Sequence, residues 1–407
     1  MVLVKTFWRK YRRKFLLVCL GVVFGLLIIE GGLRLISVLG PSQLTEDLKG
    51  LTEYLVPDDQ LQVRIKPNAP GHDEWGFRNE VVPEGVDIVA IGDSQTWGIN
   101  VQRQDAWPQK LEELSGLSVY NMALGYYGTV EYWILTEDAL TLSPDIVIIG
   151  LYPGNDIWGT YSSVYKHEAH SQLRDSNAEA LFGPDTIDDK SSEIQEATTE
   201  HLSWVENSFI TSFASFIRNH SYVAQLVWRT WENIADLRFK ASQAWAEANP
   251  ENGVVYVNGD VRMVLQPTYR LLATDLDNPR IAEGLRITCE LLGDAKREVE
   301  AAGARLVILL IPTQELAAQD VIKQAEGQLN AGYTKLVNME TSARNTIIEY
   351  CEENEIDWID SLPSLREAIN RNDMVYPSAT NGHPLGAGYA IIAKAVNEYL
   401  TGQQIID

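Results

Sequence analysis

Residues 86 to 98 read Val86-Asp-Ile-Val-Ala-Ile-Gly-Asp-Ser-Gln-Thr-Trp-Gly98, a short apolar run that ends in a polar turn. The run is bounded by Gly85 and Gly92 and is too short for a buried helix, so it predicts a buried strand of a parallel sheet. Ligands of open α/β sheets bind outside the carboxyl ends of the strands. Ser94 follows the strand directly and is a candidate nucleophile, although an ordinary turn in which Asp93 or Ser94 caps a helix fits the same residues.

Segments with the patterns of strands and helices alternate on both sides of a long central interruption, residues 161–302. Apolar runs too short for helices and amphipathic segments with helical spacing follow one another along the chain. This alternation predicts βαβ units and a parallel sheet. The other predicted strands are 118–121, 145–151, 305–311 and 356–359, and the predicted helices are 107–114, 129–142, 338–352 and 389–400.

Polar loops follow the predicted strands and should open on the same edge of the sheet as Ser94. The second strand leads into Asn121-Met-Ala-Leu-Gly125, and the third leads into Pro153-Gly-Asn-Asp156. A later loop, Tyr376-Pro-Ser-Ala-Thr-Asn-Gly-His-Pro-Leu-Gly-Ala-Gly388, precedes the last predicted helix and contains His383. Because ligands bind at the carboxyl ends of parallel strands, functional side chains are expected in these loops.

Four short blocks occur in an order that resembles the SGNH (GDSL-type) hydrolase superfamily, in particular its membrane-anchored bacterial branch. The blocks are Gly92-Asp-Ser94, Asn121-Met-Ala-Leu-Gly125, Gly154-Asn155-Asp156 and Gly382-His383-Pro384. The resemblance covers roughly residues 75–151 and 305–400. It implies a three-layer, flavodoxin-like α/β domain with a parallel sheet and a serine nucleophile.

The resemblance also implies roles for individual residues. It makes Ser94 the nucleophile and His383 its base. The oxyanion hole would consist of the backbone N–H groups of Ser94 and Gly125 and the side-chain amide of Asn155. These residue types suit acyl transfer, because serine needs a base, histidine titrates near neutral pH, and a tetrahedral intermediate needs preorganised donors. No metal or cofactor is expected.

One position departs from the family pattern. Family members carry an aspartate two or three residues before the histidine, where this chain has Asn381 and Thr380. Asn381 can orient His383, as the asparagine of Cys-His-Asn enzymes does, but replacing the aspartate of a serine triad can lower kcat about 10⁴-fold. Asp373 could supply a carboxylate from the same loop. A dyad oriented by Asn381, a triad rescued by Asp373 and a weakened enzyme are therefore three open alternatives.

The N-terminal residues predict a membrane anchor. Residues 1–14 contain six basic residues and no acidic one, and the uncharged apolar stretch 15–29 continues with few interruptions to residue 39. A spanning helix needs about 20 residues, and basic flanks stay in the cytoplasm. A cleaved signal peptide is the alternative, but no Ala-x-Ala-like site follows Ile29 and no lipoprotein-type small residues precede Cys19. Residues 15–39 are therefore predicted to cross the cell membrane once, with the catalytic domain outside the cytoplasm.

The composition argues against some classes of partner. The 407 residues carry a formal net charge of -23, and the acidic excess lies after residue 14. Such a surface would repel nucleic acids and polyanionic substrates at long range, although a well-solvated surface is the simpler account of the charge. The 3 cysteines show no disulfide framework, and four histidines of the central interruption show no metal-ligand spacing, namely His167, His170, His201 and His220.

These observations divide the chain into five parts. Residues 1–14 form a cytoplasmic tail, 15–39 the anchor, 40–83 a linker with an irregular N-terminal arm, 84–160 and 303–407 the hydrolase core, and 161–302 an acidic and helical insertion. Within the arm, Trp75-Gly-Phe-Arg-Asn79 is expected to form an aromatic clamp on the edge of the domain. The helical segments of the insertion fit core-facing stripes better than a lid or a membrane-surface helix.

The function predicted from these features is that of a membrane-anchored serine esterase. It would act on O-acyl groups, such as O-acetyl groups, of an extracytoplasmic glycan or lipid. A glycan O-acyltransferase would use the same residues, and a binding or scaffold protein that lost the carboxylate is the alternative of another class. The expected partners are therefore the membrane and a small-molecule or glycan ester, with no nucleic acid.

Overall fold

The structure is a computed structural model that describes residues 21, 24–25, 27–32, 54–175, 235–378 and 380–406. Nearly all of these residues belong to one compact unit, Leu55–His201 with Ala235–Asp407. Several predictions lie wholly or mostly outside the described residues: the basic tail 1–14, the anchor 15–39, the start of the linker and the part of the insertion from 176 to 234. Within the described parts of the chain, no helix combines the length and the apolar character needed to cross a membrane.

A five-stranded parallel sheet forms the centre of the unit and confirms the predicted strands. Its spatial order is β4 (Val119–Ala123), β3 (Ile88–Gly92), β5 (Ile146–Leu151), β8 (Arg305–Leu310) and β9 (Asp357–Asp360). Numbered along the chain, this order is 2-1-3-4-5, the doubly wound arrangement of flavodoxin-like folds. All residues of β3, β4 and β5 are buried, as expected for strands covered on both faces.

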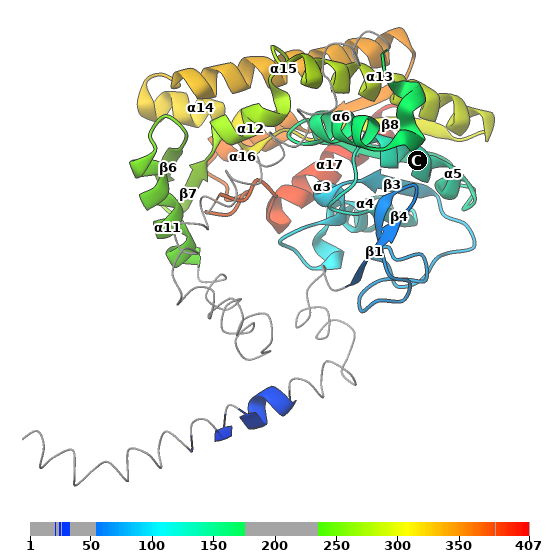
Figure 1. Ribbon diagram of the computed structural model, residues 1–407, viewed down its shortest axis with the longest axis horizontal. Coiled ribbons are helices and arrows are strands. Elements are labelled where there is room, and N and C mark those ends of the chain that lie inside the picture. The colour runs from blue at the N-terminus through cyan, green and yellow to red at the C-terminus, as the bar shows by residue number, and fades with distance from the viewer. Residues whose placement is uncertain are drawn as a thin grey trace, which may run out of the picture. The chain divides into compact units, whose positions relative to one another are not determined.

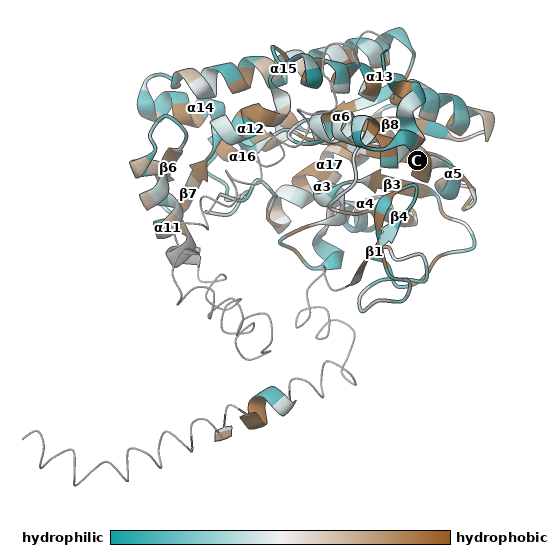
Figure 2. Ribbon diagram, in the orientation of Figure 1, coloured by the Kyte–Doolittle hydropathy of each residue, from teal (hydrophilic) through white to brown (hydrophobic). Residues whose placement is uncertain are grey.

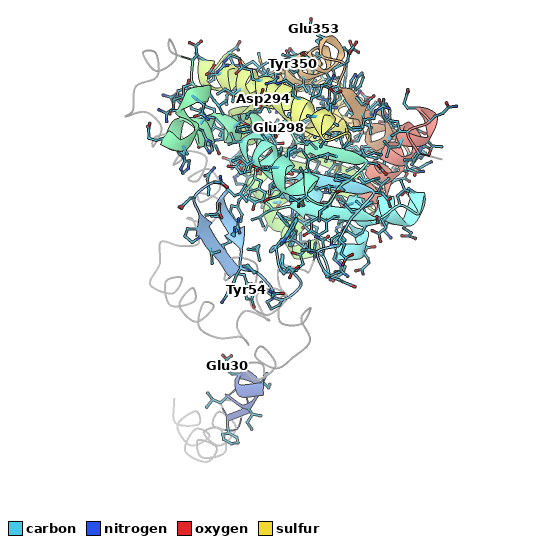
Figure 3. All side chains as sticks on the ribbon, turned by 90° about the vertical axis from the view of Figure 1, so that its right-hand side faces the viewer. Glu30, Tyr54, Asp294, Glu298, Tyr350 and Glu353 are labelled. Atoms are coloured by element: carbon cyan, nitrogen blue, oxygen red, sulfur yellow. The ribbon has the colours of Figure 1, made fainter. Side chains whose placement is uncertain are left out.

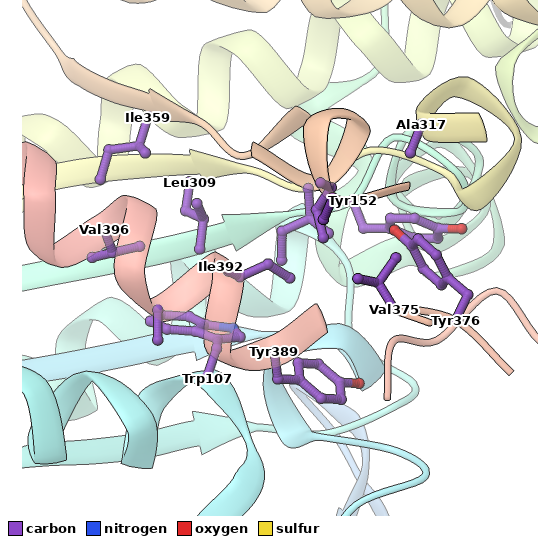
Figure 4. Close-up of a cluster of buried hydrophobic side chains, with 14 of the residues drawn as sticks. Trp107, Tyr152, Leu309, Ala317, Ile359, Val375, Tyr376, Tyr389, Ile392 and Val396 are labelled. Atoms are coloured by element: carbon purple, nitrogen blue, oxygen red, sulfur yellow. The ribbon is translucent and has the colours of Figure 1, made fainter. Parts of the chain in front are cut away.

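Alternate residues of the strands pack against two different layers of helices. Ile88 and Ala90 of β3 share a buried cluster with α4 (Trp107–Ser115) and α17 (Gly386–Gly402). Side chains of a strand alternate between its faces, so the residues between them face the second layer. Figure 4 shows the first cluster, in which Trp107 of α4 lies among Tyr389, Ile392 and Val396 of α17.

The second layer consists of α5 (Thr129–Leu140), α6 (Asp156–Lys166), α13 (Pro279–Ala301) and α15 (Ala331–Glu353), and α13 contacts each of the other three (Figure 1). A Cβ at Gly293 of α13 would clash with the Tyr350 hydroxyl of α15, so glycine permits the close approach of these helices. Figure 3 labels Tyr350 on α15 and Asp294 on α13. Figure 2 shows the strands mostly hydrophobic and the outer helices two-sided, as packing in layers requires.

The range 161–302, predicted as an insertion, contributes directly to the packed core where it is described. Its last helix, α13, contacts α5, α6 and β8. An antiparallel hairpin of β6 (Val254–Asn258) and β7 (Val261–Leu265) inserts Tyr256 and Met263 into the same cluster as the sheet. Two helices flank the hairpin, α11 (Ala235–Ala248) and α12 (Pro267–Thr274). The elements α14 (Gln314–Glu326) and α16 (Leu362–Asn370) follow β8 and β9, respectively.

The range 40–83, predicted as linker and irregular arm, contains a second hairpin. Its strands are β1 (Leu55–Asp58) and β2 (Gln62–Ile65), which pair in antiparallel register. Gln62 donates hydrogen bonds to Glu131 of α5 and Ser163 of α6, so the hairpin is fastened to the second helix layer. The prediction of an irregular arm is wrong for these residues. Apolar and polar residues alternate in β2, but both strands have only 4 residues and lie among Pro, Asp and Gly residues that favour turns.

Candidate active site

The candidate nucleophile lies at a tight turn between β3 and the short helix α3 (Ser94–Trp97). A Cβ at Gly92 would clash with the Thr96 side chain, so the turn needs glycine there. Asp93 caps α3 and accepts a hydrogen bond from the backbone N–H of Gln95 at 2.8 Å. The helix cap is therefore Asp93 and not Ser94, whose hydroxyl lies 3.2 Å from Asp93 Oδ2 and has a second, closer partner.

That partner is His383, which lies in the loop before α17. Ser94 Oγ and His383 Nε2 are 2.7 Å apart, although the two residues are 289 positions apart in the sequence. His383 Nδ1 lies 2.7 Å from Asn381 Oδ1. Because an amide oxygen only accepts, Nδ1 donates to it, and Nε2 is left with the lone pair that faces Ser94.

Asn381 belongs to a small hydrogen-bond network that was not predicted from the sequence. Its Oδ1 also accepts from the backbone N–H of His383 at 3.1 Å. Its Nδ2 donates to Asn100 Oδ1 at 2.9 Å, and Asn100 Nδ2 donates to the carbonyl oxygen of His383 at 3.2 Å. Asn100 lies two residues after Gly98, the left-handed C-cap of α3, and nothing in the sequence pattern distinguishes it.

Asp373 does not take the place of a triad carboxylate in this structure. Its carboxylate is exposed and accepts from the Arg371 guanidinium at 3.1 and 3.3 Å. The atom that faces His383 Nδ1 is instead the Asn381 oxygen. Of the two sequence-based candidates for orienting the histidine, the structure therefore brings Asn381 to it.

The three predicted oxyanion donors surround the nucleophile turn. The backbone N–H of Ser94 is at the first position of α3, where no intrahelical acceptor exists. A Cβ at Gly125 would lie 3.5 Å from Ser94 Cβ, so the loop after β4 runs directly against the serine. Asn155, the N-cap of α6, donates from Nδ2 to Asp93 Oδ2 at 3.0 Å. The carboxyl ends of three adjacent strands thus supply these groups.

Two titratable groups at the site have displaced pKa values. Burial raises the pKa of Asp93 to about 6, although hydrogen bonds from Asn155 and Gln95 oppose the rise. Burial, together with the positive charge of Arg270, lowers the pKa of His383 to about 4. His383 is therefore neutral at neutral pH and can accept a proton.

Arg270 reaches the site from α12, within the range predicted as an insertion. A Cβ at Gly382 would clash with its guanidinium nitrogen Nη2, so glycine beside His383 makes room for the arginine. Its Nε lies 3.8 Å from a carboxylate oxygen of the buried Glu315. No periodicity or motif marks Arg270 in the sequence, and its role at this site was not predicted.

The segment 75–79, predicted as an aromatic clamp, supports the nucleophile turn from behind. The guanidinium carbon of Arg78 lies 3.9 Å from the centre of the Trp97 ring. The same guanidinium donates to the carbonyl oxygens of Trp97, Gly98 and Val101 at 3.3, 3.0 and 3.0 Å. An aromatic contact with Tyr120 is present at Trp75, but the buried arginine makes the hydrogen bonds at the end of α3.

Two of the four histidines in the range 161–302 lie in the described part of the chain, and their surroundings are ordinary. His167 Nε2 lies 3.1 Å from Gln62 Oε1, and His170 is buried. His201 and His220 lie outside the described residues. Among the residues with described side chains, no group of three or more His, Cys, Asp or Glu side chains could hold a metal ion.

Comparisons with known proteins give structural similarity alone. No protein-family model matches the chain, and no curated protein matches it. The structure is similar to a putative lipolytic protein of the G-D-S-L family from Desulfitobacterium hafniense, with a TM-score of 0.37, 13% identity, and coverage of 76% of this chain and 97% of that one. A G-D-S-L family protein from Veillonella parvula matches with a TM-score of 0.35, 13% identity, and coverage of 77% and 97%.

A third similar structure is an acetylxylan esterase from Geobacillus stearothermophilus. Its TM-score is 0.35 at 12% identity, and the match covers 79% of this chain and 94% of that one. Similarities at this level do not establish an activity. A function for this chain therefore has to rest on the geometry around Ser94.

Proposed function

We propose that this protein is a serine hydrolase that cleaves acyl esters. One observation supports the proposal above the others: Ser94 Oγ, both nitrogens of His383 and Asn381 Oδ1 form a continuous chain with two contacts of 2.7 Å. Nucleophile, base and orienting group are arranged in the order that serine hydrolysis requires.

The reaction follows from the direction of these hydrogen bonds. Ser94 Oγ attacks the acyl carbonyl carbon and transfers its proton to His383 Nε2. The resulting oxyanion is stabilised by the N–H groups of Ser94 and Gly125 and by the Asn155 amide. His383 then gives the proton to the leaving alcohol, and an acyl-enzyme remains. In the second half of the reaction His383 takes a proton from a water molecule, which attacks the acyl carbon, and then returns the proton to Ser94 Oγ.

Asn381 changes the energetics of this reaction but not its steps. Its neutral oxygen holds the Nδ1–H bond of His383, yet it supplies no negative charge to the imidazolium that forms. With a pKa of about 4, His383 is also a weaker base than an unperturbed histidine. We therefore expect turnover below that of an enzyme with a carboxylate at this position.

The proposed location and substrate rest on the sequence. Residues 15–39 are proposed to anchor the chain in the cell membrane, with residues 1–14 in the cytoplasm and the catalytic domain outside. A hydrolase in that position would act on O-acyl groups, such as O-acetyl groups, of an envelope glycan or a lipid. Transfer of the acyl group to a glycan hydroxyl instead of water would use the same residues.

The test of the chemistry is labelling and turnover. Wild type should react with a fluorophosphonate probe and hydrolyse 4-nitrophenyl acetate, and Ser94→Ala should do neither while it remains folded. Ser171→Ala, which changes an exposed serine outside the site, is the matched control. Absence of labelling in the wild type would favour the binding or scaffold alternative, and acetylation of an added sugar acceptor would favour the transferase.

The topology has a separate test. Alkaline phosphatase is active only outside the cytoplasm, so its fusion after residue 41 should be active, and a cytoplasmic reporter at the same position should be inactive. The reverse result would contradict the proposed location without affecting the proposal for Ser94.

A further inference from the structure

We infer that Asn100 is a positioning residue that fixes the orientation of the Asn381 amide and, through it, the tautomer of His383, a role that rests on the function proposed above. An asparagine presents an oxygen and an NH2 group of nearly equal size, so either can face the histidine. If Asn381 Nδ2 faced His383 Nδ1, then His383 Nδ1 would have to accept a hydrogen bond, and His383 Nε2 would carry the proton. Ser94 could then not be deprotonated, and a wrong tautomer of this kind lowers kcat about 10⁴-fold in a serine triad.

The network around Asn381 permits only one orientation. It begins at the backbone N–H of His383, which donates to Asn381 Oδ1, and it ends at the carbonyl oxygen of His383, which accepts from Asn100 Nδ2. Between these ends, Asn381 Nδ2 donates to Asn100 Oδ1. A backbone N–H can only donate and a carbonyl can only accept, so turning over either amide would bring donor against donor and acceptor against acceptor.

Asn100 is held in place independently of this network. Its φ of 73° lies in the left-handed region, which asparagine adopts more readily than most residues. The residue before it, Ile99, accepts a hydrogen bond at its carbonyl oxygen from the hydroxyl of Tyr389 at 3.1 Å. Tyr389 is buried in α17, the helix that follows the His383 loop. The backbone that carries Asn100 is therefore tied to the first turn of the helix that follows the His383 loop.

A simpler role for Asn100 would be to hold the loop of His383 through the bond to its carbonyl oxygen. The two roles differ in what they predict for the tautomer of His383. A carboxylate at position 381 only accepts, so it presents an oxygen to His383 Nδ1 whichever way it turns and does not need Asn100 for that. It also draws Asn100 Nδ2 away from the His383 carbonyl oxygen, so the measurement that separates the roles is the tautomer, which a loop-holding role would leave unchanged.

The experiment measures kcat and KM of Asn100→Gly in the wild-type and Asn381→Asp backgrounds, with the whole chain. Glycine keeps the left-handed backbone, so the variant removes the side chain alone. We expect kcat to fall about 10- to 100-fold in the wild-type background with little change in KM, and less than about 3-fold in Asn381→Asp. Asn372→Gly, another exposed asparagine with positive φ of 67°, is the matched control and should be unchanged. Equal losses in the two backgrounds, or no loss in either, would overturn the inference.

A second measurement does not depend on turnover. Nitrogen-15 NMR of the imidazole, assigned against His383→Gln, should show the Nδ1–H tautomer in wild type and a mixture of tautomers in Asn100→Gly. A pure Nδ1–H tautomer in Asn100→Gly would contradict the role of Asn100 even if the protein proved to be an esterase. Conversely, a shift to a mixture would support it even if the substrate proposal failed.

Discussion

The side chain of Asn155 donates a hydrogen bond to the buried carboxylate of Asp93, with Nδ2 and Oδ2 3.0 Å apart. The other oxygen of Asp93 caps α3, and Oδ2 also lies 3.2 Å from Ser94 Oγ. One carboxylate thus joins the N-terminus of the nucleophile helix to a predicted oxyanion donor from a different strand. The Asp93 carboxylate is buried away from water, and this burial raises its pKa.

This buried carboxylate gives a prediction about stability and pH. Because the pKa of Asp93 is about 6 in the folded protein and near 3.8 when unfolded, the folded state holds the proton more tightly. The stabilisation is complete below pH 3.8 and is lost as pH rises through about 6. Asp93→Asn, which keeps an N-cap residue, should lose this dependence, so its stability relative to wild type should rise by up to about 3 kcal/mol between pH 4 and pH 7.5. Urea unfolding across this range checks the result, and parallel pH curves for the two proteins would contradict it.

The charge of Arg270 gives a prediction about activity and pH. The lowered pKa of His383, about 4, places the acid limb of kcat/KM near that pH, because only neutral His383 can act as base. Arg270→Met removes the positive charge, so the pKa of His383 and the acid limb should move upward, though not to 6.5, since burial remains the larger cause. The pH profile of kcat/KM measures the shift. Arg270→Lys keeps the charge and is the control, and equal shifts in both variants would assign the effect to packing.

The choice between Asn381 and Asp373 as partner of His383 can be tested directly. Asn381→Ala removes the acceptor of the Nδ1–H bond and should lower kcat about 10²- to 10⁴-fold. Asp373→Ala should change kcat less than about 2-fold, because this exposed carboxylate pairs with Arg371 instead. Steady-state kinetics on an acetyl ester give both values. The opposite ranking would mean that a carboxylate from the loop serves the histidine in solution.

Arg78 is expected to stabilise both the fold and the nucleophile turn. Arg78→Met leaves three carbonyl oxygens at the end of α3 without their donor and should lower the free energy of unfolding by about 3 kcal/mol, with a loss of activity. Arg103→Met is the control, because Arg103 pairs with the exposed Glu80 and should cost less than about 1 kcal/mol. Chemical denaturation measures both. Similar costs for the two arginines would show that the buried hydrogen bonds contribute little.

The strands of the main sheet were predictable because burial on both faces leaves a strong signal. Residues such as those of β3 and β5 form short, almost wholly apolar runs, and few other structures accommodate such runs. The positions of Ser94 and His383 followed from the polar loops at the ends of these strands. Their contact itself depends on the order of the strands in the sheet, which residue patterns constrain only indirectly.

Other parts of the site could not be predicted, for different physical reasons. Asn100 acts through hydrogen bonds to Asn381 and His383, which follow it by 281 and 283 positions. Contacts so distant in the sequence leave no local pattern. Arg270 lies on α12, a helix of 8 residues that the sequence pattern did not predict, and no motif surrounds it. The hairpin of β6 and β7 differs from these two, because the two residues of its turn, Gly259-Asp260, are a recognisable hairpin signal.

The distance along the chain between Ser94 and His383 has a consequence for biosynthesis. Every strand of the described sheet is made before the base, since His383 follows β9. At about 5–20 residues per second, the ribosome needs roughly 15 to 60 seconds to add the 289 positions between nucleophile and base. During that interval the growing polypeptide exposes a serine that nothing can deprotonate. Newly made chains would therefore cleave no ester until α17 docks against α4, and the onset of activity would report that docking.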